Sequence, residues 1–137
     1  MLTNTAVTIY NKYIQSRAEK YQRTVIPAAL WESAAAVSKR NSADLALNKA
    51  LIAIPFSECR KYYSHKMWLA LDAQNRATHW TLSEGDIVVR GSVADEITDS
   101  FTVSALRAKY DDVLEIASVA RMDQGSPNTH HMMVGCK

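Results

Sequence analysis

The residue types best suited to metal chemistry in this chain are its four histidines and two cysteines. His130 and His131 are adjacent, and adjacent residues of a strand point to opposite faces, so the two side chains are poorly placed to bind one ion. The other residues of these types stand apart, without the paired spacing of a zinc site: Cys59, His65, His79 and Cys136. The spacing therefore predicts no metal centre, and no motif indicates a cofactor.

Nucleophilic catalysis is not indicated by any motif either. A Ser or Cys nucleophile needs a base and an acidic residue that orients the base. No Ser lies in a nucleophile elbow, and neither cysteine lies in the signature of a cysteine enzyme. The acidic residues between 95 and 112 lack the spacing of a calcium loop, and Ser83–Asp86 lacks the Lys of a phosphate-binding loop. The sequence therefore predicts a protein that is not an enzyme.

Cationic and aromatic residues supply the remaining candidates. Lys39 with Arg40, and Arg60–Tyr63, could contact phosphate and stack on bases, but a net charge of +2 is small for a nucleic-acid-binding protein. The large rings of Trp31, Trp68 and Trp80 are typical of cores and of protein interfaces. We interpret the three tryptophans as core residues or subunit-interface anchors, rather than as a ligand cage.

Length and composition indicate one domain over residues 1–137. A chain of 137 residues with 47% apolar and 22% charged side chains can bury a single core without disulfides or metals. The N-terminus lacks the basic and apolar regions of a signal peptide, and no apolar run reaches the ~20 residues of a membrane span. We therefore expect a protein that is made in the cytoplasm, keeps its thiols free and does not contact a membrane.

The two parts of the chain differ in charge. Residues 1–76 contain eleven Lys and Arg against five Asp and Glu, whereas residues 77–137 contain five against nine. If the two parts lie on different faces, copies of the chain would attract head to tail, which favours rings or filaments over two-fold dimers. A mixed and well-solvated surface is the alternative.

Most of the expected elements are strands, because apolar, β-branched and aromatic residues alternate in short runs between turn residues. Pro27 predicts an edge position or a bulge. We expect a mainly β fold, a small closed or partly open β-barrel of about six to eight short strands with one or two short helices, or else a sandwich. The expected strands are Ala6–Tyr10, Tyr21–Trp31, Leu45–Phe56, His79–Leu82, Ile87–Gly91, Val113–Val119 and Thr129–Cys136.

The connections include one clear helix and one ambiguous segment. Val103–Tyr110 is expected to be helical after Thr102, whereas residues 57–71 fit either a strand or a short helix capped by Ser64. The remaining connections are expected to be irregular: a connection over 15–20, an extended loop or hairpin arm over 33–46, a turn at Asp72–Asn75, a tight turn at Gly85 and a polar loop over 92–100.

Short stretches in chain order carry a family resemblance that covers nearly the whole sequence. They are Leu2–Asn11, Arg23–Ile26, Trp31–Glu32, Ser42–Asp44, Ile54–Phe56, Trp80–Leu82, Gly85–Gly91, Tyr110–Leu114 and Gly125–Pro127. Together they resemble an uncharacterised family of structural proteins of Firmicutes prophages. The C-terminal order of a Gly-Asp turn, a core strand and a hairpin with His130 and His131 is also similar to tailed-phage head-closure proteins, also called head-completion, neck or minor capsid proteins.

The resemblance implies a homo-oligomeric ring, often six-fold, in the head–tail connector of the virion. Such a ring binds the portal or adaptor protein on one side and the tail terminator on the other, and it helps to retain packaged DNA. The family has no catalytic residues to transfer. Lys39 and Arg40 are our candidates for non-specific contact with DNA in the lumen, because cations in a loop can meet phosphate without reading sequence. A tail-terminator or other tail-attachment ring is the alternative, and a stand-alone nucleic-acid-binding barrel is the second.

Overall fold

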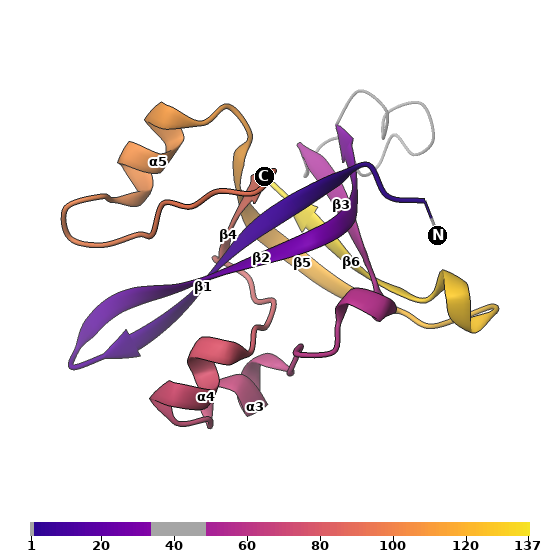
Figure 1. Cartoon of the computed structure of the whole chain (residues 1–137), viewed down its shortest axis with the longest axis horizontal. Coiled ribbons are helices and arrows are strands. Elements are labelled where there is room, and N and C mark those ends of the chain that lie inside the picture. The colour runs from indigo at the N-terminus through magenta and orange to yellow at the C-terminus, as the bar shows by residue number, and fades with distance from the viewer. Residues whose placement is uncertain (1, 34–48) are drawn as a thin grey trace.

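A closed barrel of six antiparallel strands is the main feature of the computed structural model, which describes residues 2–33 and 49–137 (Figure 1). The strands are hydrogen-bonded in the order β1-β2-β3-β6-β5-β4, and β4 closes onto β1. The prediction of a mainly β barrel is therefore confirmed. The strand bounds are β1 Thr5–Gln15, β2 Ala18–Ser33, β3 Ala50–Pro55, β4 Ile87–Arg90, β5 Val113–Met122 and β6 His131–Cys136.

The hairpin of β1 and β2 is longer than the sequence pattern predicts. β1 continues to Gln15 and pairs there with Ala18, so only Ser16 and Arg17 form the turn. Both have positive φ angles, 54° and 63°, as two-residue hairpin turns require to match the twist of the strands. The expected irregular connection over 15–20 is thus a tight turn between two long strands.

Replacing Arg17 with glycine is expected to stabilise the protein. Arg17 has a side chain in the left-handed region, which glycine occupies at no steric cost. The free energy of unfolding of Arg17→Gly should rise by about 1 kcal/mol, measured by urea denaturation. Lys20→Gly is the matched control, because Lys20 lies in the regular part of β2 and should lose stability instead. A fall in both variants would contradict the assignment of the turn.

Pro27 lies at an irregularity in β2, as predicted. Val7 pairs with Ile26 but Thr5 pairs with Ala29, so β2 contains one more residue than β1 at this point. Such a bulge bends a strand. Beyond the bulge, β2 pairs with β3 from Leu30 onward.

Within residues 2–33 and 49–137, three short α-helices and two 3-10 helices connect the strands, which is more than the one or two helices expected. Helix is the correct alternative for residues 65–69, although Ser64 makes no side-chain capping bond. The turn predicted at Asp72–Asn75 is wrong, because the Asp72 side chain accepts a hydrogen bond from Asn75 N (2.8 Å) and starts a helix. The helices are η1 Phe56–Glu58, α3 His65–Leu69, α4 Ala73–Thr78, α5 Val103–Lys109 and η2 Pro127–Thr129.

The strand predicted at His79–Leu82 is also wrong. Trp80 forms only an isolated bridge to Tyr62. The next residue, Thr81, has its backbone N–H and C=O bonded to the side chain of Asn11 at 3.2 and 2.7 Å. A side chain therefore satisfies backbone groups that a neighbouring strand would otherwise bind.

Two apolar clusters form the core. The larger one fills the barrel and includes Val7, Ile9, Ile52, Val88 and Val134. The smaller one lies outside the barrel wall, where α5 and the irregular segment 92–101 cover β1 and β4; it includes Tyr10, Val89, Val93, Leu106 and Val113. As predicted, a helix follows Thr102 and 92–100 forms no regular element; the Thr102 side chain caps α5 by accepting from Ala105 N.

The barrel has two different ends. β2 and β6 end where β3 and β5 begin, and we call this the mouth end. The opposite end carries the Ser16–Arg17 turn, α3 and α4, and we call it the hairpin end; Figure 1 shows these helices beside the hairpin and away from α5. The predicted arm over 33–46 begins at Ser33, the last residue of β2, and its other residues lie outside the described part of the chain.

Candidate functional site

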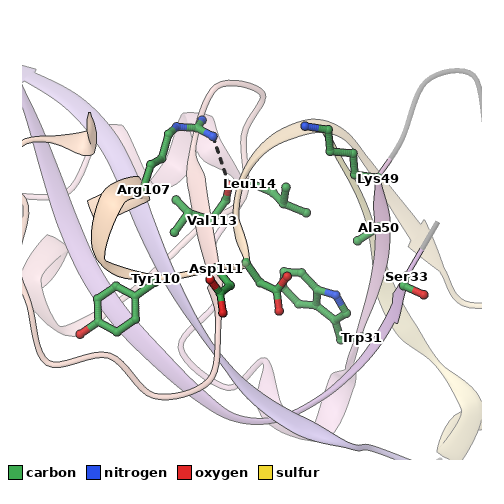
Figure 2. A pocket seen from close by; sticks show the side chains of 10 residues that line it. Trp31, Ser33, Lys49, Ala50, Arg107, Tyr110, Asp111, Val113 and Leu114 are labelled. Atoms are coloured by element: carbon green, nitrogen blue, oxygen red, sulfur yellow. Dashed lines mark hydrogen bonds between the residues drawn. The ribbon is translucent and has the colours of Figure 1, made fainter. Parts of the chain in front are cut away.

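A polar hollow of about 400 Å³ opens at the mouth end. Figure 2 shows its two walls: the facing ends of β2 and β3, and the turn that leads from α5 into β5. Arg107 is held in place because its guanidinium donates to Val113 O at 3.1 Å. The lining residues are Trp31, Ser33, Lys49, Ala50, Arg107, Tyr110, Asp111, Asp112, Val113 and Leu114.

The hollow offers charged groups of both signs. Lys49 and Arg107 are cationic, and Asp111 and Asp112 are exposed carboxylates on the same rim. Across residues 2–33 and 49–137, no group of three or more His, Cys, Asp or Glu side chains is arranged to hold a metal ion. The charged side chains around the hollow can form ion pairs and hydrogen bonds, which suits contact with a charged partner.

The carboxylate of Asp95 holds α5 against the barrel wall. It accepts hydrogen bonds from Tyr110 Oη at 2.5 Å and from Lys109 Nζ at 2.9 Å. These bonds lower the pKa of Asp95 below its ordinary value. The Asp95 carbonyl accepts from Tyr10 Oη at 2.6 Å, and burial raises the pKa of Tyr10 to about 12. The acidic segment is therefore an ordered part of the surface.

A buried carboxylate at Asp86 joins the turn before β4 to the hairpin. It accepts hydrogen bonds from Asn11 Nδ2 (2.8 Å), Lys12 N (2.9 Å) and Ser83 N (3.0 Å). Burial raises the pKa of Asp86, while the bonds from Lys12 and Asn11 act in the opposite direction. The tight turn predicted at Gly85 is confirmed, with a φ of 91°, but nothing in the sequence indicates that the carboxylate of Asp86 beside it is buried.

Tyr13 packs the hairpin onto α3 and α4. Its ring meets the ring of Trp68 edge-on, with 5.9 Å between centroids. The guanidinium of Arg76 lies over the Tyr13 ring at 5.0 Å. These contacts build a continuous surface from two elements that are far apart in the sequence.

Three large apolar side chains are exposed on β1 and α3 at this end of the molecule. Ile14, near the end of β1, is 72% exposed, and Met67 and Leu69 on α3 are 58% and 43% exposed. Ile14 and Leu69 line one shared hollow, so they form a joint apolar patch. Exposed patches of this kind are typical of protein-interaction surfaces.

The three tryptophans lie in the core. Trp31, Trp68 and Trp80 are 5%, 0% and 3% exposed, and Trp68 Nε1 donates to His79 O at 3.0 Å. The tryptophans therefore occupy the positions expected of core residues. Rings this buried leave little surface for the alternative interpretation, a subunit interface.

The other candidate residues are dispersed. His130 packs edge-on against Phe56, and His131 begins β6, so the pair forms no shared site. Both cysteines are free thiols; burial raises the pKa of Cys59 to about 11 and that of Cys136 to about 12. Lys39 and Arg40 lie outside the described residues.

Fold and surface together define a class: a small closed β-barrel whose distinctive features are charged and apolar contact surfaces. Within that class, a family model described as Family of unknown function (DUF6751) matches residues 2–137, and the chain belongs to that family. No curated protein and no solved structure matches the chain. None of the helices in the described ranges is long and apolar enough to cross a membrane.

Proposed function

We propose that this protein is a structural component of a tailed-phage or prophage virion. Its place is the head-completion, or neck, ring that links the portal and adaptor to the tail and helps to retain packaged DNA. The family resemblance of the sequence and the closed barrel support this function. The observation that carries it is the separation of charge across the surface.

The hairpin end is cationic, whereas the side of the molecule around α5 is acidic. The cations at the hairpin end outnumber the acidic residues there; the cations are Lys12, Arg17, Lys20, Arg60, Lys61, Lys66, Arg76 and Arg121, and the acidic residues are Glu19, Glu58, Asp72, Glu84, Asp86 and Asp123. In residues 92–112, Asp95, Glu96, Asp99, Asp111 and Asp112 outnumber Arg107 and Lys109. Unlike surfaces on one chain favour head-to-tail contacts, which close into a ring when the rotation between copies permits.

The exposed apolar patch gives such a contact a source of affinity. Ile14 and Leu69 line a hollow that also contains the cations Lys12 and Arg76 and the carboxylates of Glu19, Glu84 and Asp86. Burial of apolar side chains supplies most of the affinity of association, whereas charge complementarity steers and orients the partners. A neighbouring copy that covers the apolar side chains and pairs carboxylates with the cations of the hairpin end fits this combination. Lys39 and Arg40 stay in the proposal as cations for non-specific contact with packaged DNA.

Antibody labelling of separated heads and tails tests this position. Virions of the phage that encodes the chain are split into heads and tails, and bound antibody is located by electron microscopy. The label should appear on the head, at the site where the tail was attached. Label on the end of the detached tail would instead favour the tail-terminator alternative. Virions without the chain, judged by mass spectrometry of their proteins, would contradict a structural role.

A further inference from the structure

β2 is paired on only one side over most of its length. Residues from Ala18 to Ala29 pair with β1, and pairing with β3 begins only at Leu30. The bulge beside Pro27 separates the two regions. The closed barrel therefore includes a long hairpin whose second strand has an open edge.

The direction of the backbone groups follows from the register. Ala6 O accepts from Gly91 N, and Lys12 N donates to the Asp86 side chain, and both partners lie on the β4 side of β1. The backbone groups of the even-numbered residues of β1 therefore point away from β2. In an antiparallel ladder the partners of these residues also point outward. No backbone partner on that outer side is present among the described residues. The outward-pointing residues of β2 are Glu19, Tyr21, Arg23 and Val25.

A groove of about 570 Å³ lies beside the part of this edge nearest Pro27. Residues Thr24–Pro27 of β2 form one wall, and Ser57, Glu58, Arg60 and Lys61, which lie in and after η1, form the opposite wall. An edge strand beside a groove is the arrangement that binds an extended peptide, because the backbone supplies affinity and the groove receives alternate side chains.

The rim of the groove is cationic. Arg60 and Lys61 are exposed, and neither has an ion-pair partner in the described part of the chain. Glu58 is the one acidic residue among those that line the groove. Charge complementarity therefore favours an occupant with carboxylate side chains.

We propose that β2 is a docking edge for an extended, acidic segment of another protein, which adds to the β1–β2 hairpin as a third strand. The N–H and C=O groups of Tyr21, Arg23 and Val25 bond to the added backbone, while Arg60 and Lys61 pair with its carboxylates. A second copy that docked through its own β2 edge would bring two cationic rims together, so the occupant of this edge is a segment of a different protein. This assignment does not depend on the role in the virion.

A short peptide of alternating Thr and Glu, with an alternating Thr and Lys peptide as the charge control, tests the docking edge. In ¹⁵N-labelled protein, the amide resonances of Tyr21, Arg23 and Val25 should shift as the acidic peptide is added. The cationic peptide should bind about tenfold more weakly. Shifts that avoid β2, or equal affinity for both peptides, would overturn the proposal, as would a concentration-dependent dimer through β2 in place of peptide binding.

Two variants test the contributions of the cationic side chains and of the β2 backbone to peptide binding separately. Arg60→Glu with Lys61→Glu should reverse the preference between the peptides, whereas Lys49→Glu, at the mouth end, should leave it unchanged. Val25→Pro removes an outward N–H without removing a ladder bond to β1 and should abolish binding. Because the charge variants change exposed side chains only, they decide the question even if the proline variant unfolds.

Discussion

Asp86→Ala is expected to lower the free energy of unfolding by about 3 kcal/mol or more at neutral pH. Asp86 is 1% exposed and accepts three hydrogen bonds, from Asn11, Lys12 and Ser83. The alanine variant leaves the backbone N–H groups of Lys12 and Ser83 without this acceptor and removes one of the two acceptors of Asn11 Nδ2, at a site that is largely closed to water. Urea or thermal denaturation followed by circular dichroism measures the loss.

The loss of unfolding free energy in Asp86→Ala should depend on pH. Burial raises the pKa of Asp86 in the folded protein, so the folded state binds this proton more tightly than the unfolded state does. The contribution of Asp86 to stability is therefore largest below the ordinary carboxyl pKa and declines as the pH rises through the raised value. The difference between wild type and Asp86→Ala should be larger at acidic pH than at neutral pH.

Asp72→Ala is the matched control. Asp72 also accepts a backbone hydrogen bond, from Asn75, but at an exposed helix start. Its removal should cost about 1 kcal/mol, with no comparable effect on the hairpin. Equal losses in the two variants would contradict the view that the buried network at Asp86 holds the hairpin in place.

The strands and α5 could be predicted because their signals are local. β-branched and apolar residues alternate in Val7–Ile9 and Val113–Val119, and Thr102 precedes an apolar helical stripe, so each segment prefers the structure that it adopts. The tight turn at Gly85 belongs to the same group, because glycine accepts the positive φ angle at little cost.

The predicted strand at His79–Leu82 and the predicted turn at Asp72–Asn75 were wrong for two different reasons, a distant side chain in the first case and an ambiguous local signal in the second. Trp80 and Leu82 alternate like strand residues, yet the Asn11 side chain occupies the backbone groups of Thr81 between them. The first residues of α4 resemble a turn, because Asp and Asn are equally common in turns and at helix starts. Neither outcome can be predicted from the segment alone.

The surfaces were the least predictable part. An acidic residue beside a glycine is usually solvated, so the burial of Asp86 gave no local signal. The open edge of β2 follows from where β3 begins to pair, which is a matter of register between strands. The charge difference between the two parts of the chain was visible in the sequence, but the fold brings residues of both parts together, as with Lys49 and Asp111 at the mouth end.

Deletion of the gene from the phage or prophage that encodes it is expected to abolish infectious particles. A neck ring supplies both the stopper for packaged DNA and the docking surface for the tail, so its loss should separate two structures that are otherwise complete. Expression of the wild-type chain from a plasmid should restore plaques, which controls for effects on neighbouring genes.

Electron microscopy of the deletion lysate is the most direct test of the proposed function. We expect full-size heads that have lost their DNA, together with free tails of normal length. Tails of uncontrolled length would point to a terminator instead, and joined, infectious virions in normal number would contradict any role in the neck.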